Sequence, residues 1–269
     1  RAKIFMPRMT RRRKTEGEPL PPLRHKLRAE QGKGARGNMR DNGKGALSEL
    51  NTAPFTAERE WTVEGVPVLT AAVSLPQPDP LTGKVSRRIH RYYQLQCRAF
   101  LRYCGSWLLP QAEAAYRAAL EASGPLPEFR AELGYRVTWN GGGLWSLCTQ
   151  SREQTGSGPA LLTRRGDTWD LAAGYPVPLG DFFPAGSRWK KRLLALAAEE
   201  IQRRERAGAA RWREGWRRAL RKSFNSQNYC LTEEGLAFFF PMYAIAPPSE
   251  GIPTFVLPYG EEGARRLRG

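Results

Sequence analysis

The stretch that decides the fold runs from residue 229 to residue 259 and reads YCLTEEGLAFFFPMYAIAPPSEGIPTFVLPY. It predicts a strand-turn-strand unit, because the apolar start Tyr229–Leu231 is followed by a polar turn ending at Gly235, a residue able to adopt positive φ. The run Leu236–Phe240 is apolar throughout, as in a strand covered on both faces. After two prolines that force an extended backbone, Thr254–Leu257 predicts a last short strand. We interpret the stretch as scaffold rather than as a catalytic site.

A second block consists of Trp169–Leu171 and then VPLGDFF at 177–183, and helical sequence separates it from the first stretch. Together the two blocks resemble the RsiV-type C-terminal domain family, a domain of unknown function shared by the anti-sigma factor RsiV, the peptidoglycan deacetylase PdaC and many proteins of Firmicutes. The resemblance covers roughly residues 62–260 and is most specific over 167–183 and 229–259. RsiV is membrane-anchored and its extracellular part binds lysozyme. The resemblance therefore implies a non-catalytic binding or sensor module at the cell envelope.

The net charge of +17 is unevenly distributed, since more than half of it falls within residues 1–48. Residues 1–58 are rich in Arg, Lys, Gly and Pro and have few apolar side chains, so they cannot bury enough surface to offset the entropy of ordering. We therefore expect a disordered basic tail over 1–58. A solvated tail is the simpler interpretation of its basic run, but four residues are candidate contacts for nucleic acid or another polyanion: Arg11, Arg12, Arg13 and Lys14.

Residues 59–260 predict one folded domain, followed by a short tail over 261–269. The first part of this domain, 61–124, begins with strand-forming residues and continues into a long amphipathic segment. There an apolar stripe at spacings of three and four predicts a helix over 86–122. Pro110 should kink or split that helix, because proline removes a backbone donor from the helix interior.

The more recognisable part, 129–260, alternates apolar and polar residues between Gly-rich turns, which predicts strands and a hairpin. A second helix is expected over 187–206 from its own apolar stripe. The predicted fold class is therefore α+β, an antiparallel β-sheet with helices packed on one face. We expect the strands of 229–259 to lie beside the 169–183 segment in the middle of this sheet.

A further helical stretch follows Gly208 and carries tryptophans on one face and basic residues on the others. Two interpretations remain open for it. It is either a solvated helix that packs its tryptophans on the sheet, or a phosphate-contacting face over residues 211–222. The second interpretation makes three residues candidate polyanion contacts: Arg213, Arg217 and Arg221.

Residues with catalytic chemistry are sparse. The chain has two histidines, and neither is placed for a triad with a Ser or Cys nucleophile. No Cys or His spacing fits a metal site, so we expect no metal, no cofactor and no enzymatic activity. The four cysteines are too few for a disulfide-built scaffold. The sequence allows a Cys148–Cys230 pair between strands but gives no support for it.

Four side chains are the candidate binding residues of the predicted module. The acids that we single out are Asp170 and Asp181, although aspartates in turns and at helix starts often bond only their local backbone. The aromatics Tyr243 and Tyr259 lie in loops around the last strands, where core packing explains them at least as well as ligand contact. A hydrolase that uses Asp170 and Asp181 is a weaker hypothesis.

The positive charge favours an acidic partner over a lysozyme. Lysozymes are usually strongly basic, and like charges slow association. An unknown protein or an anionic envelope polymer is therefore the expected partner, and nucleic acid bound through the tail is the alternative. No run approaches the roughly 20 apolar residues of a membrane span. The compartment depends on sequence upstream of Arg1: a hydrophobic segment there implies the cell envelope, and a start at Met6 or Met9 implies the cytoplasm.

Overall fold

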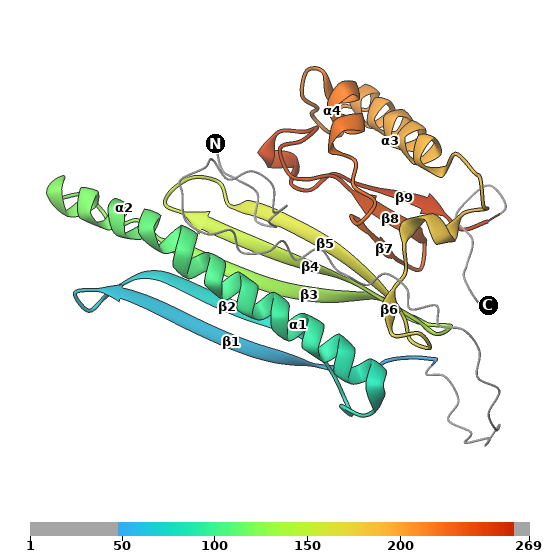
Figure 1. Ribbon diagram of the computed structural model, residues 1–269. Helices are drawn as coiled ribbons and strands as arrows, with labels where there is room; N and C mark the ends of the chain where they lie inside the picture. Colours follow the sequence, from blue (N-terminus) through green and yellow to red (C-terminus); the bar gives the residue numbers. More distant parts are fainter. Residues whose placement is uncertain (1–47, 261–269) are drawn as a thin grey trace, which may run out of the picture.

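The computed structural model describes residues 48–260, so the tail expected over 261–269 and most of the one expected over 1–58 lie outside the described residues. Six strands form one sheet in sequence order, and its strands are antiparallel except for the β2–β3 pair. Parallel neighbours need a long connection, and here helices provide it (Figure 1). The six strands are β1 (Thr52–Val63), β2 (Val66–Pro78), β3 (Phe129–Gly141), β4 (Leu144–Thr155), β5 (Leu161–Asp170) and β6 (Tyr175–Pro176).

The helical connection consists of α1 (Gly83–Tyr103), the π-helical turn η1 (Cys104–Leu108) and α2 (Leu109–Glu121). It confirms the helix predicted over 86–122, and the irregular turn lies just before Pro110, the predicted kink. No helix within 48–260 is long and apolar enough to cross a membrane. The predicted apolar stripe is buried in a core shared with β2, β3 and β4, through Ile89, Tyr93, Cys97, Phe100 and Cys104.

The C-terminal stretch forms a second sheet of three antiparallel strands with β8 in the centre. The predicted strand-turn-strand unit and its last strand are thereby confirmed. The strands are β7 (Tyr229–Leu231), β8 (Gly235–Phe239) and β9 (Thr254–Pro258). The helices α3 (Trp189–Arg206) and α4 (Trp216–Ser223) precede them. The short 3-10 turn η2 (Leu179–Phe182) comes before α3, and η3 (Pro248–Glu250) lies between β8 and β9.

The two sheets stack, and this corrects the single sheet that we predicted from 169–183 and 229–259. Side chains alternate along β4, so Trp145 and Leu147 join the core beneath α1, whereas Cys148 packs against the second sheet. The second sheet needs covers on both sides because β8 is buried along its whole length. One cover is α3 and the other is the first sheet. The α+β class is confirmed, and the two predicted long helices cover different sheets (Figure 1).

The first described residues also correct a predicted boundary. Regular structure begins at Thr52, inside the 1–58 segment for which we expected disorder, and Leu50 is already buried. The backbone N–H of Leu50 donates to Asn140 Oδ1 at 2.8 Å, and Asn140 Nδ2 donates back to the Leu50 carbonyl at 3.2 Å. An edge strand such as β1 is held mainly by backbone hydrogen bonds to its neighbour. Composition therefore gives little sign of it.

Candidate functional site

The two acids singled out in the sequence, Asp170 and Asp181, line the same pocket of about 360 Å³ beside β6. Asp170 Oδ1 accepts the backbone N–H groups of Ala172 at 2.8 Å and Ala173 at 3.0 Å, so this carboxylate holds the turn after β5. Asp181 is exposed in η2. The structure therefore brings the two acids together, and it gives Asp170 the local backbone role that aspartates commonly have in turns.

The two candidate tyrosines lie apart from this pocket and are both half-buried. Tyr259 donates its hydroxyl to the Thr232 carbonyl at 3.1 Å and packs its ring against Trp139. The Tyr243 carbonyl accepts a hydrogen bond from the guanidinium of Arg213. Tyr259 thus holds the loop beside the second sheet through its side chain, whereas Tyr243 takes part through its backbone carbonyl.

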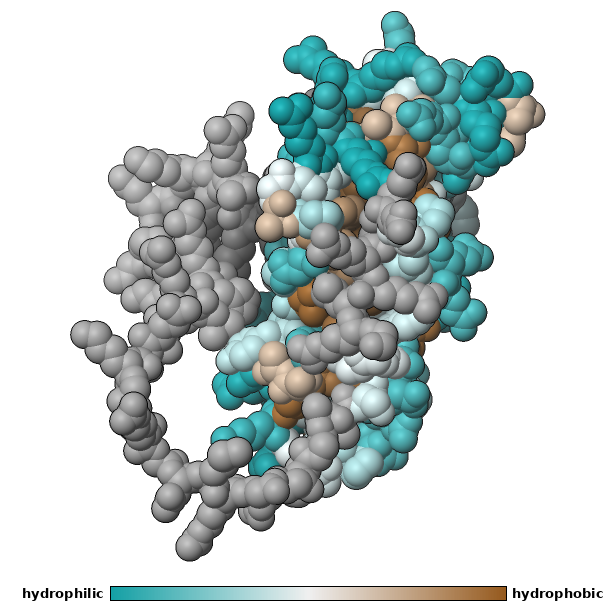
Figure 2. Space-filling model, turned by 90° about the vertical axis from the view of Figure 1, so that its right-hand side faces the viewer, coloured by the Kyte–Doolittle hydropathy of each residue, from teal (hydrophilic) through white to brown (hydrophobic). Residues whose placement is uncertain are grey.

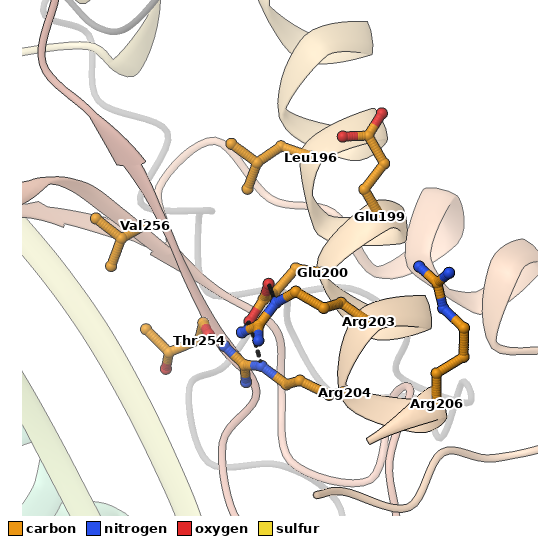
Figure 3. Close-up of a pocket in the computed structure, with 8 residues that line it drawn as sticks. All are labelled: Leu196, Glu199, Glu200, Arg203, Arg204, Arg206, Thr254 and Val256. Carbon is orange, nitrogen blue, oxygen red and sulfur yellow. Dashed lines mark hydrogen bonds and ion pairs between the residues drawn. The ribbon is translucent and has the colours of Figure 1, made fainter. Parts of the chain in front are cut away.

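A larger cleft of about 570 Å³ lies between the end of α3 and β9, an edge strand of the second sheet. Its walls combine a short apolar strip with a dense group of charges (Figure 3). The residues that line it are Leu196, Glu199, Glu200, Arg203, Arg204, Arg206, Thr254 and Val256. We call this hollow the basic cleft.

Two arginines share one carboxylate in the basic cleft. Arg203 binds Glu200 through Nε at 2.7 Å and Nη2 at 2.6 Å, and Arg204 Nε reaches the same carboxylate at 2.6 Å (Figure 3). The hydrogen bonds from Arg203, joined by those from Arg204, lower the pKa of Glu200 to about 2. Arg206, also on the wall, donates to the Gln202 carbonyl of its own helix. Three guanidinium groups and two carboxylates, those of Glu199 and Glu200, therefore line the cleft, which leaves an excess of one positive charge.

The predicted polyanion contacts Arg213, Arg217 and Arg221 lie on α4 and in the loop before it, and none of them lines the basic cleft. Trp216 is buried, which confirms that the helix packs a tryptophan inward. Arg217 lies over the Trp216 ring at 4.6 Å and is exposed to solvent, as is Arg221. Arg213 is exposed as well and ties its loop to Tyr243. Packing and a basic face therefore coexist on α4, whereas the basic run Arg11–Lys14 lies outside the described residues.

The sequence reasoning missed the arginines of α3, although the run QRRER at 202–206 could have indicated them. Residues 189–223 carry twelve basic side chains and four acidic ones. Figure 2 shows hydrophilic residues gathered over the end of the molecule that carries α3 and α4 in Figure 1. Within 48–260, no group of three or more His, Cys, Asp or Glu side chains could hold a metal ion.

A buried carboxylate, also missed from the sequence, lies between the first sheet and η1. Glu153 on β4 is only 3% exposed, and its Oε2 accepts the Tyr103 hydroxyl at 2.9 Å. Burial raises the pKa of Glu153 to about 7. Other buried polar atoms on the same side of β4 have no hydrogen-bond partner in the described part of the chain, including Thr149 Oγ1 and Ser151 Oγ. This side of the first sheet is therefore an internal polar layer.

Glu153→Gln should change how stability depends on pH. An unfolded glutamate titrates near pH 4.3, so between that pH and about 7 the folded protein binds more protons than the unfolded one, and its stability falls as pH rises. Glutamine removes this loss. The free energy of unfolding of the variant minus that of wild type should rise by roughly 2–3 kcal/mol from about pH 4 to pH 8, measured by urea unfolding. The control is Glu58→Gln on the exposed edge strand β1, and a Glu153→Gln curve parallel to wild type would refute the assignment.

The fold and the cleft together define a class: an α+β domain of two stacked sheets with a basic cleft on its smaller sheet. Residues 180–260, which include that sheet and its helices, match the family described as "Protein of unknown function (DUF3298)". The match includes the 229–259 stretch on which the sequence resemblance mainly rests. No curated protein is significantly similar to the chain.

Two solved structures share the fold. The chain is similar to a member of the DUF3298 family from Bacteroides fragilis, with a TM-score of 0.59 and 14% identity over 81% of this chain and 95% of that one. It is also similar to a DUF3298 family protein from Pseudomonas aeruginosa PAO1, with a TM-score of 0.50 and 17% identity over 78% of this chain and 91% of that one. At these identities the likeness establishes the architecture alone, which extends well beyond the matched residues.

Proposed function

We propose that the chain is a non-catalytic binding module that takes an acidic partner at the cell envelope through the basic cleft and the adjoining face of α4. The observation that carries this proposal is the excess of guanidinium groups over carboxylates in the cleft wall, three against two, with Arg203 and Arg204 sharing the carboxylate of Glu200. An anionic group entering the cleft would meet charged donors that are already held in place by that ion pair. Guanidinium groups bind phosphate and carboxylate oxygens in a planar, two-pronged geometry, which suits them to such a partner.

The envelope location rests on the resemblance to the RsiV-type family, in which the domain lies outside the membrane or beside a peptidoglycan deacetylase. An anionic wall polymer fits the charge of the cleft, and a basic lysozyme does not, because like charges repel and slow association. A neutral glycan fits the site less well, since most of the cleft wall is charged. We therefore favour a phosphodiester-linked wall polymer as the partner. Nucleic acid, which has the same linkage, is the competing partner in the test.

Arg203→Ala/Arg206→Ala should weaken binding of poly(glycerol phosphate) at least tenfold, because it removes two exposed cations from the cleft and leaves Glu200 paired with Arg204. Isothermal titration calorimetry at several salt concentrations would measure this loss and a shallower dependence on salt. The matched control is Arg98→Ala/Arg102→Ala, which removes two exposed arginines from α1 on the opposite outer layer. Equal losses in both variants would show nonspecific attraction. Tighter binding of duplex DNA than of the wall polymer would favour the intracellular nucleic-acid function instead.

A further inference from the structure

Two cysteines from distant parts of the chain meet where the two sheets stack. The Sγ atoms of Cys148 on β4 and Cys230 on β7 lie 2.9 Å apart. Cys230 is buried and Cys148 is half-buried. The apolar side chains of Ala237, Phe239, Ile252 and Val256 pack around them.

The strands around this pair are fixed on both sides, so the sulfurs cannot easily move apart. One residue after Cys230, the Leu231 N–H donates to Ser146 Oγ at 2.9 Å. One residue before it, the Tyr229 carbonyl lies directly against Gly166 on the neighbouring strand β5. The two sulfurs are closer than unbonded sulfur atoms ordinarily approach. A movement of about 1 Å would bring them to the bond length of a disulfide, which is about 2.05 Å.

The electrostatic setting favours the thiolate at one of the two sulfurs. A hydrogen bond from the Cys148 thiol lowers the pKa of Cys230, and the same contact raises the pKa of Cys148. The guanidinium groups of Arg164 and Arg136 favour the thiolate form of both cysteines. A thiolate is the nucleophile in thiol–disulfide exchange, so this setting favours exchange at the pair.

We propose that Cys148 and Cys230 form a disulfide that cross-links the two sheets. The oxidant is a donor disulfide, either glutathione disulfide or the active-site disulfide of an oxidoreductase. The thiolate of one cysteine attacks one donor sulfur and releases the other as a thiolate. The thiolate of the second cysteine then attacks the protein sulfur of the mixed disulfide and releases the second donor thiolate. Both protein protons go to solvent, and the donor takes up the two electrons.

The remaining cysteines provide an internal comparison. Cys97 and Cys104 are buried beneath α1 on one helix face, seven residues apart. Along a helix this spacing separates their backbones by roughly 10 Å, which is beyond disulfide reach. The proposal therefore predicts one specific link and two free thiols. The link also belongs to an oxidising compartment, and this agrees with an envelope location while resting on observations separate from the basic cleft.

The test is made on the full chain, folded in a glutathione redox buffer and then unfolded in guanidinium with an alkylating reagent. Peptide mapping should find Cys97 and Cys104 alkylated, and one peptide pair joined through Cys148 and Cys230. Alkylation of all four cysteines, or a link through Cys97 or Cys104, would overturn the proposal without any variant having to fold. A wild-type protein that fails to bind the wall polymer would contradict the proposed function and leave this result untouched.

Reduction should also lower the melting temperature of the wild-type protein by roughly 5–15 °C, because the link constrains the long chain segment between Cys148 and Cys230 in the unfolded state. Cys148→Ala/Cys230→Ala should melt at the same temperature with and without reductant. Cys97→Ala/Cys104→Ala should keep the sensitivity of wild type, although it melts lower overall. A wild-type melting temperature that reductant does not change would count against the cross-link.

Discussion

Gly166→Ala is expected to unfold the protein or to detach the second sheet from the first. A Cβ atom added at Gly166 would lie 1.6 Å from the carbonyl oxygen of Tyr229 and 2.5 Å from its carbonyl carbon. These are backbone atoms of β7, so no side-chain rotation relieves the clash. The strand itself would have to move, and the Leu231–Ser146 hydrogen bond beside it would break. We expect a loss of about 4 kcal/mol or more, at the upper end for single substitutions.

Urea unfolding followed by tryptophan fluorescence measures this loss. Gly134→Ala is the matched control, because Gly134 lies in β3 of the same sheet and an added Cβ would meet nothing within 4 Å. That substitution should be neutral or slightly stabilising, since alanine reduces the freedom of the unfolded chain. If the two alanine variants unfold at the same urea concentration, the result would contradict the close backbone contact between Gly166 of β5 and Tyr229 of β7.

Asp167→Ala is expected to cost about 3 kcal/mol, because it leaves the half-buried Arg165 and the hydroxyls of Tyr92 and Tyr93 without their buried acceptor. Asp167 on β5 is 5% exposed and accepts the Tyr92 hydroxyl at 3.0 Å, the Tyr93 hydroxyl at 3.4 Å and Arg165 Nε at 3.2 Å. Burial, reinforced by the negative charge of Asp167, raises the pKa of both tyrosines. This carboxylate therefore joins α1 to the first sheet.

The control for this prediction is Asp170→Ala, three residues further along the chain. Asp170 holds its turn through two backbone N–H groups, a role comparable to that of a helix cap, whose loss costs about 1 kcal/mol. Chemical denaturation of both variants should therefore separate them by at least about 2 kcal/mol. A smaller cost for Asp167→Ala than for Asp170→Ala would mean that the buried network contributes little.

The proposed disulfide and the close approach at Gly166 both join the second sheet to the first. Cys148 lies outside the 180–260 family match, whereas Cys230 lies within it. The cross-link and the tight β5–β7 contact thus join the matched part to the first sheet, and the core of the matched part also includes Leu144 and Trp139 of the first sheet. We therefore expect the matched residues to need the first sheet for stability. The basic cleft lies at the β9 edge of the second sheet, where Thr254 accepts a hydrogen bond at 3.2 Å from Arg164 of the first sheet.

Much of the local structure could be predicted from the sequence. The helix over 86–122, the strands of 229–259 and the α+β class follow from apolar spacings of about 3.6 and 2 residues. The α4 helix also packs a tryptophan inward as predicted. The start of β1 could not be found this way, because an edge strand depends on backbone hydrogen bonds to β2 rather than on its own apolar pattern.

The sequence by itself determined the elements, the excess of positive charge and the sparseness of catalytic residues, because these depend on residue types and near neighbours. Only the tertiary structure decided that the strands form two stacked sheets, that Asp167 rather than Asp170 joins the layers, and that Cys148 meets Cys230. Such contacts join residues about 75 to 82 positions apart. They depend on which faces of the sheets and helices pack together, and the spacing of residues along the chain does not determine this.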